Sequence, residues 1–300
     1  MKIAVTGATG FIGKYIVNHF SKRHVVRAIG RDMNVLNQTF GNKIELYESD
    51  YSFQSLIKSL ENIDVVIHLA AQLMQRDTHP LKLSQFYHGN VQTTENLLLA
   101  SEIKGISKVC LLSSISVYSK HNTLPFNELA LPFPENIYGV SKLACEHLGC
   151  LFNDKTKVKV IVLRLARLYG HGEREGLVFT EFIKQASQKQ KLTIWGSGNT
   201  SIDYIYVKDV ISAINKAVTS KSQQGIFNIG SGKSYSIKEI AECINEVFEN
   251  KGNISFKPNQ HEGRFNIYMD CTKAKELLRW SPEWTLKGAL YDIKNKMTNQ

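Results

Sequence analysis

Thr6-Gly7-Ala8-Thr9-Gly10-Phe11-Ile12-Gly13 is the most informative stretch in this chain of 300 residues. It follows a short apolar run at residues 3–6 and opens a segment of helical spacing at residues 11–22. Glycines in such a loop permit a tight turn and a close approach of the backbone to a pyrophosphate. Unpaired N–H groups at the start of the following helix then face the phosphates. The stretch predicts a dinucleotide-binding loop, with a purely structural turn as the alternative.

Short apolar runs alternate with longer helical patterns through the first half of the chain. Runs that are continuously apolar are typical of strands covered on both faces, and strand–helix alternation favours parallel pairing. We therefore predict an α/β fold with a Rossmann-like doubly wound parallel sheet. The expected strands are 3–6, 25–29, 44–47, 65–69, 109–113 and 160–163, and the expected helices are 11–22, 52–60, 82–104 and 137–153.

The pattern changes after about residue 170. Glycines punctuate shorter elements, strands are expected near 204–207 and 226–229 around a helix near 209–219, and residues 231–300 look mostly helical. A chain of this length typically forms roughly two domains. We predict a Rossmann domain of residues 1–170 plus about 204–230. A smaller, partly interleaved C-terminal α/β substrate lobe would comprise about 171–203 and 231–300.

The composition and the distribution of apolar residues exclude several classes of protein. The formal net charge of +10 suits an anionic partner, although the basic residues are scattered and equally serve solubility. Five cysteines without a CxxC pair argue against a disulfide framework and against a structural zinc site, so we expect no metal. We find no apolar run approaching the roughly 20 residues of a membrane span, no signal peptide and no base-stacking platform. The expectation is a cytoplasmic protein that binds neither membrane nor nucleic acid.

Two further segments carry chemistry. Tyr138-Gly139-Val140-Ser141-Lys142 puts a phenol and an ammonium on one face, if the segment is helical. A cation beside a phenol favours its deprotonated form, which suits acid–base work near neutral pH. The serine-rich stretch Leu112-Ser113-Ser114-Ile115-Ser116-Val117-Tyr118 ends the fifth expected strand, where open α/β sheets carry active sites.

The glycine spacing GxxGxxG, the serine-rich strand end and the YxxxK motif occur in this order between residues 7 and 142. Together they resemble the short-chain dehydrogenase/reductases, specifically the extended branch of nucleotide-sugar epimerases, dehydratases and reductases. The resemblance implies an enzyme in which Tyr138 is the acid–base group, Lys142 assists it and Ser114 orients the substrate oxygen. It also implies the following cofactor-binding residues: Gly7, Thr9, Gly10, Phe11, Ile12, Gly13, Arg31, Asp50, Leu69, Ala70, Ala71, Asn90, Tyr138 and Lys142.

The end of the second expected strand bears on the choice of nicotinamide cofactor. An NAD-selective site usually has an acidic side chain there, which accepts a hydrogen bond from the ribose 2′-hydroxyl. This chain has Gly30 and Arg31 instead. Glycine leaves room and a guanidinium pairs well with a 2′-phosphate, so we expect NADP(H) to be preferred. NAD(H) is the alternative, because Asp32 follows directly and would restore that preference if it turned inward.

The substrate implied by the resemblance is a nucleotide-linked sugar. Arg167 and Arg264 are the candidate clamps for its diphosphate, although each arginine equally suits a surface ion pair. Arg167 stands where the family usually has asparagine. This difference weakens the inference that this chain contacts its substrate as other family members do. The family's dehydratases carry Thr-Asp-Glu where this chain has Ser114-Ile115-Ser116, so that 4,6-dehydration is disfavoured.

The leading hypothesis is the reduction of a 4-keto nucleotide sugar with NADPH by Ser114, Tyr138 and Lys142. The alternative is a nucleotide-sugar 4-epimerase, similar to UDP-glucose 4-epimerase, that holds NAD tightly. A hypothesis of another class is a non-catalytic dinucleotide-sensing protein. A homodimer is expected, and the sequence leaves the identity of the sugar open.

Overall fold

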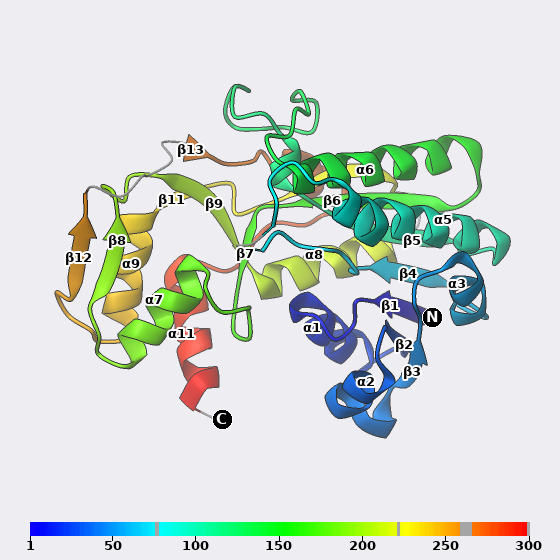
Figure 1. Ribbon diagram of the computed structural model, residues 1–300, viewed down its shortest axis with the longest axis horizontal. Coiled ribbons are helices and arrows are strands. Elements are labelled where there is room, and N and C mark those ends of the chain that lie inside the picture. Colours follow the sequence, from blue (N-terminus) through cyan, green and yellow to red (C-terminus); the bar gives the residue numbers. More distant parts are fainter. Residues whose placement is uncertain (76–77, 221–222, 259–265, 299–300) are drawn as a thin grey trace.

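A parallel sheet forms the centre of the molecule (Figure 1). The computed structural model describes residues 1–75, 78–220, 223–258 and 266–298. The seven strands of the sheet stand in the order β10-β6-β5-β4-β1-β2-β3, and every neighbouring pair is parallel. They are β1 (Lys2–Thr6), β2 (Val25–Gly30), β3 (Glu45–Glu48), β4 (Val65–His68), β5 (Lys108–Ser114), β6 (Lys159–Leu165) and β10 (Gly225–Ile229). The predicted Rossmann-like α/β fold is confirmed.

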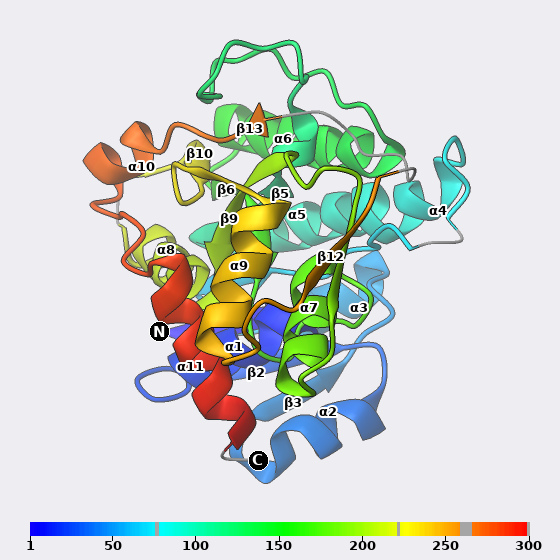
Figure 2. The ribbon, with the colours of Figure 1, turned by 90° about the vertical axis from the view of Figure 1, so that its left-hand side faces the viewer.

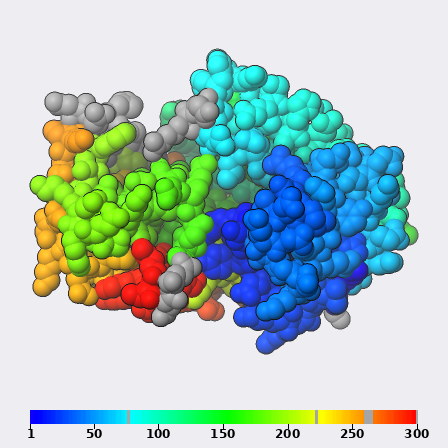
Figure 3. All heavy atoms as spheres, turned by 60° about the horizontal axis from the view of Figure 1, so that its bottom comes forward, coloured from blue at the N-terminus to red at the C-terminus, as the bar shows by residue number. Residues whose placement is uncertain are grey.

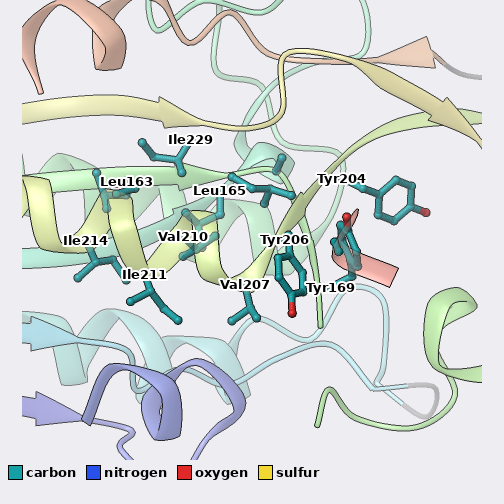
Figure 4. Close-up of a cluster of buried hydrophobic side chains, with 14 of the residues drawn as sticks. Leu163, Leu165, Tyr169, Tyr204, Tyr206, Val207, Val210, Ile211, Ile214 and Ile229 are labelled. Atoms are coloured by element: carbon teal, nitrogen blue, oxygen red, sulfur yellow. The ribbon is translucent and has the colours of Figure 1, made fainter. Parts of the chain in front are cut away.

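Helices cover both faces of this sheet, which explains why its central strands are largely apolar and buried. Alternate strand residues point to opposite sides: Ile3 and Val5 enter one buried cluster, whereas Ala4 enters the other. The first face is covered by α1 (Phe11–Phe20), α2 (Met33–Phe40) and α8 (Val207–Thr219), and the second by α3 (Phe53–Ser59), α5 (Thr93–Ile103) and α6 (Ile137–Lys155). Figure 4 shows part of the first cluster, where side chains of α8 meet those of β6 and β10.

The remaining strands form two smaller sheets in the C-terminal region. One sheet has the order β11-β9-β13 with β7 also paired to β9, and the other pairs β12 with β8. The strands are β7 (Arg167–Tyr169), β8 (Leu192–Trp195), β9 (Ser201–Tyr206), β11 (Ser234–Ser236), β12 (Ile254–Lys257) and β13 (Asn266–Ile267). The helices are α7 (Val178–Ser187), α9 (Ile237–Val247), α10 (Thr272–Leu277) and α11 (Leu286–Thr298), several of which face the viewer in Figure 2. Figure 3 shows this region beside the N-terminal residues, which are drawn in blue.

The structure differs from the sequence prediction at several elements. The described part of residues 231–300 holds three short strands besides its helices. The sequence prediction did not include the helix α2, although half of its eight residues are apolar. The helix expected at 82–104 is divided into α4 (Ser84–Phe86), a π-helical turn (Tyr87–Gln92) and α5. Residues 204–206, grouped above with the Rossmann domain, lie in β9 of a small sheet, whereas β10 joins the main sheet. The domain boundaries given above stay a prediction.

In the described ranges, no helix combines the length and the apolar character needed to cross a membrane.

Candidate active site

A cavity of about 950 Å³ lies at the carboxyl ends of the central strands. On the sheet side it is lined by the loop after β1 and by the ends of β2, β4, β5 and β6. The opposite wall comes from the C-terminal region and includes Arg167, Glu173, Leu177, Ile202 and Ile267. An adjoining cavity of about 480 Å³ shares lining residues with it. The cavities thus lie at the edge of the sheet where α/β proteins bind ligands.

The glycine loop after β1 is packed so tightly that side chains would not fit. Gly7 has a φ of +63°, and a Cβ on it would lie 2.7 Å from the backbone nitrogen of Ala70. A Cβ on Gly13 would lie 2.4 Å from the carbonyl oxygens of Gly7 and Ala8. α1 begins after Gly10 without a side-chain cap, which leaves the N–H groups of its first turn facing the cavity. This cradle fits a dinucleotide pyrophosphate.

The end of β2 presents Arg31 to both cavities. Asp32 caps α2: its Oδ1 accepts hydrogen bonds from the backbone nitrogens of Asn34 at 2.8 Å and Val35 at 3.2 Å. If the Asp32 side chain turned into the cavity, α2 would therefore lose its N-terminal cap. Gly30, Arg31 and Asp32 all line the large cavity at this strand end, and the cap of α2 occupies only the Oδ1 of Asp32.

The smaller cavity contains Asp50 and part of the segment after β4. The Oδ1 of Asp50 accepts from the backbone nitrogen of Ser52 at 2.9 Å, and hydrogen bonds from Ser52 lower the pKa of this carboxyl. Leu69, Ala70 and Ala71 line the large cavity, and Ala70 and Ala71 also line the small one. These residues are placed as an adenosine half of a dinucleotide site would require.

Asn90, predicted as a cofactor contact, lines neither cavity among the described residues. Its side chain is buried, accepts from the backbone nitrogen of Gln72 at 2.6 Å and donates to the Oγ of Ser141 at 2.9 Å. Asn90 therefore ties the segment after β4 to the start of α6. The geometry makes it a link between two walls of the cavity.

The three predicted catalytic residues line the same large cavity. Ser114 ends β5, and its hydroxyl donates to the Oγ of Ser116 at 3.1 Å. Tyr138 and Lys142 lie one turn apart on α6, and the Lys142 Nζ is 5.8 Å from the centre of the Tyr138 ring. The same Nζ donates to the carbonyl oxygen of Leu112 at 2.9 Å, which fixes it beside β5. The structure thus brings a hydroxyl, a phenol and an ammonium together beside the glycine cradle.

Gly139 allows this approach and was not singled out from the sequence. A Cβ on Gly139 would lie 2.3 Å from the carbonyl oxygen of Ser116, so only glycine lets α6 pack so closely on the strand end. The side chain of Asn136 caps the helix by accepting from the backbone nitrogen of Gly139 at 2.8 Å. In the sequence, the indication of this close packing is a glycine directly after the tyrosine of the YxxxK motif.

A buried ion pair anchors α6 to the sheet. The Arg164 Nη2 lies 2.7 Å from the Oε2 of Glu146, and the two side chains are 3% and 2% exposed. The Arg164 guanidinium also lies 4.7 Å from the centre of the Tyr118 ring, just after the strand-end serines. Glu146 follows Lys142 by one helical turn, so the pair holds the helix that carries the phenol and the ammonium.

His68, at the end of β4, belongs to the supporting core. Burial, with a smaller effect of the Lys142 charge, lowers the pKa of His68 to about 3, so that its ring is neutral at physiological pH. Its two ring nitrogens face the hydroxyls of Thr6 at 2.7 Å and Thr94 at 3.3 Å. The ring therefore links β1, β4 and α5 by hydrogen bonds and has no free proton acceptor for the cavity.

The substrate half of the site differs in part from the prediction. Arg167 lines the cavity, whereas Arg264 lies outside the described residues. Glu173, which the sequence analysis did not identify, lines the same wall, and burial raises the pKa of its carboxyl to about 7. In the sequence it resembled a surface residue of a glycine-containing turn, and only the fold places it in the cavity.

Residues 3–230 match the model of the NAD dependent epimerase/dehydratase family. The chain belongs to this family. It is an enzyme of the extended short-chain dehydrogenase/reductase type, as the sequence motifs indicated.

Relatives of this family member include several epimerases. A putative UDP-glucose 4-epimerase of Methanocaldococcus jannaschii is 33% identical and covers 99% of this chain and 98% of its own. The crystal structure of UDP-N-acetylglucosamine 4-epimerase from Bacillus cereus has a TM-score of 0.89 at 35% identity, covering 100% of this chain and 97% of that chain. UDP-glucuronic acid 4-epimerase from Bacillus cereus, in complex with UDP-glucuronic acid and NAD, has a TM-score of 0.87 at 28% identity and covers 99% and 100% of the two chains.

These findings correct the order of the functional hypotheses. The relatives favour the epimerase alternative over the 4-keto reduction that the sequence analysis ranked first. The solved UDP-glucuronic acid 4-epimerase is in complex with NAD, which gives no support to a preference for NADP. The single cationic side chain of Arg31 at the end of β2 says nothing about whether a cofactor is exchanged or retained.

Proposed function

We propose that the protein is a UDP-hexose 4-epimerase. The observation that carries this proposal is the shared cavity of Ser114, Tyr138 and Lys142 beside the glycine cradle, in a chain similar over its length to UDP-sugar 4-epimerases. Bound nicotinamide supplies a reversible hydride acceptor. In the proposed reaction Tyr138 takes the proton of the sugar 4-hydroxyl. It returns this proton after the 4-keto sugar has rotated in the site and presents its opposite face to the nicotinamide. No redox equivalent is consumed overall.

Each residue has a distinct part in this proposal. Ser114 holds the oxygen at C4 by a hydrogen bond, and Lys142 favours the deprotonated phenol through its positive charge. The loop from Gly7 to Gly13 would hold the pyrophosphate, Asp50 the adenine amino group, and the backbone at Leu69 to Ala71 a ribose. Arg167 would pair with the substrate diphosphate. The size of the cavity, about 950 Å³, suits a ligand that must rotate between two half-reactions.

The reaction can be tested without any added cofactor. The purified protein is expected to interconvert UDP-glucose and UDP-galactose, as followed by proton NMR, and to release a nicotinamide dinucleotide into the supernatant when it is denatured. Stoichiometric oxidation of added NADPH by a 4-keto nucleotide sugar, without interconversion, would instead establish the reductase.

The choice of dinucleotide is a separate part of the proposal. An epimerase regenerates its cofactor, so binding alone decides between NAD(H) and NADP(H). With Asp32 engaged as the cap of α2, we propose that Arg31 favours the 2′-phosphate of NADP(H).

Replacing Arg31 by alanine is expected to weaken NADPH binding by about tenfold or more, on the scale of one charge-assisted hydrogen bond, and NADH binding hardly at all. Fluorescence titration of protein stripped of its cofactor gives both affinities. Arg23→Ala, at an exposed position outside the cavity, is the matched control. An equal loss for the two dinucleotides would argue that Arg31 does not select between them.

We further propose a cytoplasmic homodimer. Leu99 and Ile103 on α5 and Leu151 on α6 are exposed apolar side chains on two neighbouring helices, which suits a helical interface between two copies. The five cysteines are free thiols, as is usual in a reducing compartment. Light scattering is expected to give about twice the chain mass of 33.9 kDa.

A further inference from the structure

Glu173 places a carboxyl group in the wall of the large cavity that the C-terminal region supplies. It lies between β7 and α7, and Arg167 at the start of β7 lines the same wall. Arg167 follows Leu165 by two residues, and Leu165 is the parallel-pair neighbour of Ser114. This wall therefore begins directly beyond the proposed catalytic hydroxyl, and at Gly170 and His171 it also packs against Phe11 and Tyr15 of α1.

The backbone around Glu173 is fixed at several points. The Glu173 nitrogen donates to the carbonyl oxygen of Gly170 at 3.3 Å. The Nη1 of Arg174 donates to the carbonyl oxygen of Met74 at 2.9 Å, which joins this turn to the segment after β4 on the other side of the cavity. The Oγ1 of Thr180 donates to the carbonyl oxygen of Arg174 at 3.1 Å. These hydrogen bonds fix the conformation of the turn and therefore the position of the Glu173 carboxyl group.

The carboxyl group is partly buried and has no hydrogen bond or ion pair with any residue that the structure describes. Its charged neighbours are Arg167 on β7 and Arg174 in the same turn, and the phenol of Tyr204 on β9 is also near. Burial outweighs the two arginines and raises the pKa of Glu173 to about 7. A partly buried acid without a partner favours a ligand that donates a hydrogen bond and opposes a second negative charge.

We propose that Glu173 makes the enzyme select nucleotide hexoses that are uncharged beyond the diphosphate and reject nucleotide hexuronates. The inference rests on the proposed 4-epimerase function. A sugar hydroxyl donates a hydrogen bond to the Glu173 carboxylate, whereas the carboxylate of a hexuronate meets a like charge in a site of low polarity. Rejection by an unfavourable charge pair is a common source of specificity.

The test compares the dissociation constants of UDP-glucose and UDP-glucuronate by calorimetry with the protein as purified. At pH 8, Glu173→Gln is expected to lower the ratio of the UDP-glucuronate constant to the UDP-glucose constant by at least about tenfold, or about 1.4 kcal/mol. In the unmodified protein this ratio is expected to fall between pH 8 and pH 6, because protonation removes the charge of Glu173. Burial raises the pKa of Tyr204, so its phenol stays neutral in this range. Glu173→Gln is expected to abolish the pH dependence.

Glu175→Gln is the matched control, since Glu175 lies in the same turn but is exposed and does not line the cavity. It is expected to leave the ratio and its pH dependence unchanged. Equal ratios in the unmodified protein and Glu173→Gln, with both UDP-sugars bound, would overturn the role of Glu173 and leave the epimerase proposal standing. If neither UDP-sugar binds to any of the three proteins, both proposals are wrong.

Discussion

Tyr138→Phe is expected to lower kcat for the interconversion of UDP-glucose and UDP-galactose by at least about 100-fold, on the usual scale for the loss of a general acid–base group. The phenylalanine ring fills the same space on α6, but it has no oxygen to take and return the proton of the sugar hydroxyl. The contacts of Lys142 with the carbonyl oxygen of Leu112 are not affected by the change. Dinucleotide affinity, measured by fluorescence titration, is therefore expected to change little.

The control for Tyr138 is Tyr291→Phe, because Tyr291 is 45% exposed on α11 and does not line the cavity. This control is expected to keep kcat within about twofold of the unmodified enzyme. Should Tyr138→Phe turn over as fast as the control, the phenol is not the acid–base group and the proposed mechanism has to be abandoned. A parallel loss of dinucleotide binding would show instead that Tyr138 supports the cofactor site.

Glu146→Ala is expected to lower the free energy of unfolding by about 3–5 kcal/mol, because it leaves the Arg164 guanidinium buried and unpaired. The pair is bidentate, with the Nε and Nη2 of Arg164 at 3.0 and 2.7 Å from the Glu146 carboxylate. The remaining contacts of Arg164 are the Tyr118 ring and the carbonyl oxygen of Glu128 at 3.3 Å, which do not neutralise its charge. Urea denaturation followed by circular dichroism measures the effect.

Two controls separate the charge effect from general damage to α6. Replacing both partners, as Glu146→Leu with Arg164→Met, is expected to recover most of the lost stability, since apolar side chains of similar volume commonly substitute for a buried ion pair. Glu246→Ala removes the exposed pair between Glu246 and Lys287, whose side chains are 60% and 50% exposed, and is expected to change the stability far less because water screens the pair. If Glu146→Ala costs no more than Glu246→Ala, the ion pair does not anchor the catalytic helix.

The main sheet, the glycine loop and the family could all be predicted from the amino-acid sequence. These features depend on short stretches: continuous apolar runs, glycines at fixed spacing, and a tyrosine and a lysine one helical turn apart. Each stretch has a local physical meaning, such as a strand covered on both faces or a helix start that faces phosphate. The α/β fold and the meeting of Ser114, Tyr138 and Lys142 at one sheet edge follow from these local rules together with parallel strand order.

The tertiary structure decided what depends on partners distant in the chain. The strands β11, β12 and β13 are too short to be recognised alone, and they exist because they pair with β9 and β8. In the same way, Asn90 faces Gln72 and Ser141, and Glu146 meets Arg164 on a different element. Glu173 reads as a surface residue in the sequence, and the packing of the turn before α7 puts its carboxyl group in the cavity wall. Burial and charge pairing are properties of the packed chain, so a single sequence carries no local pattern for them.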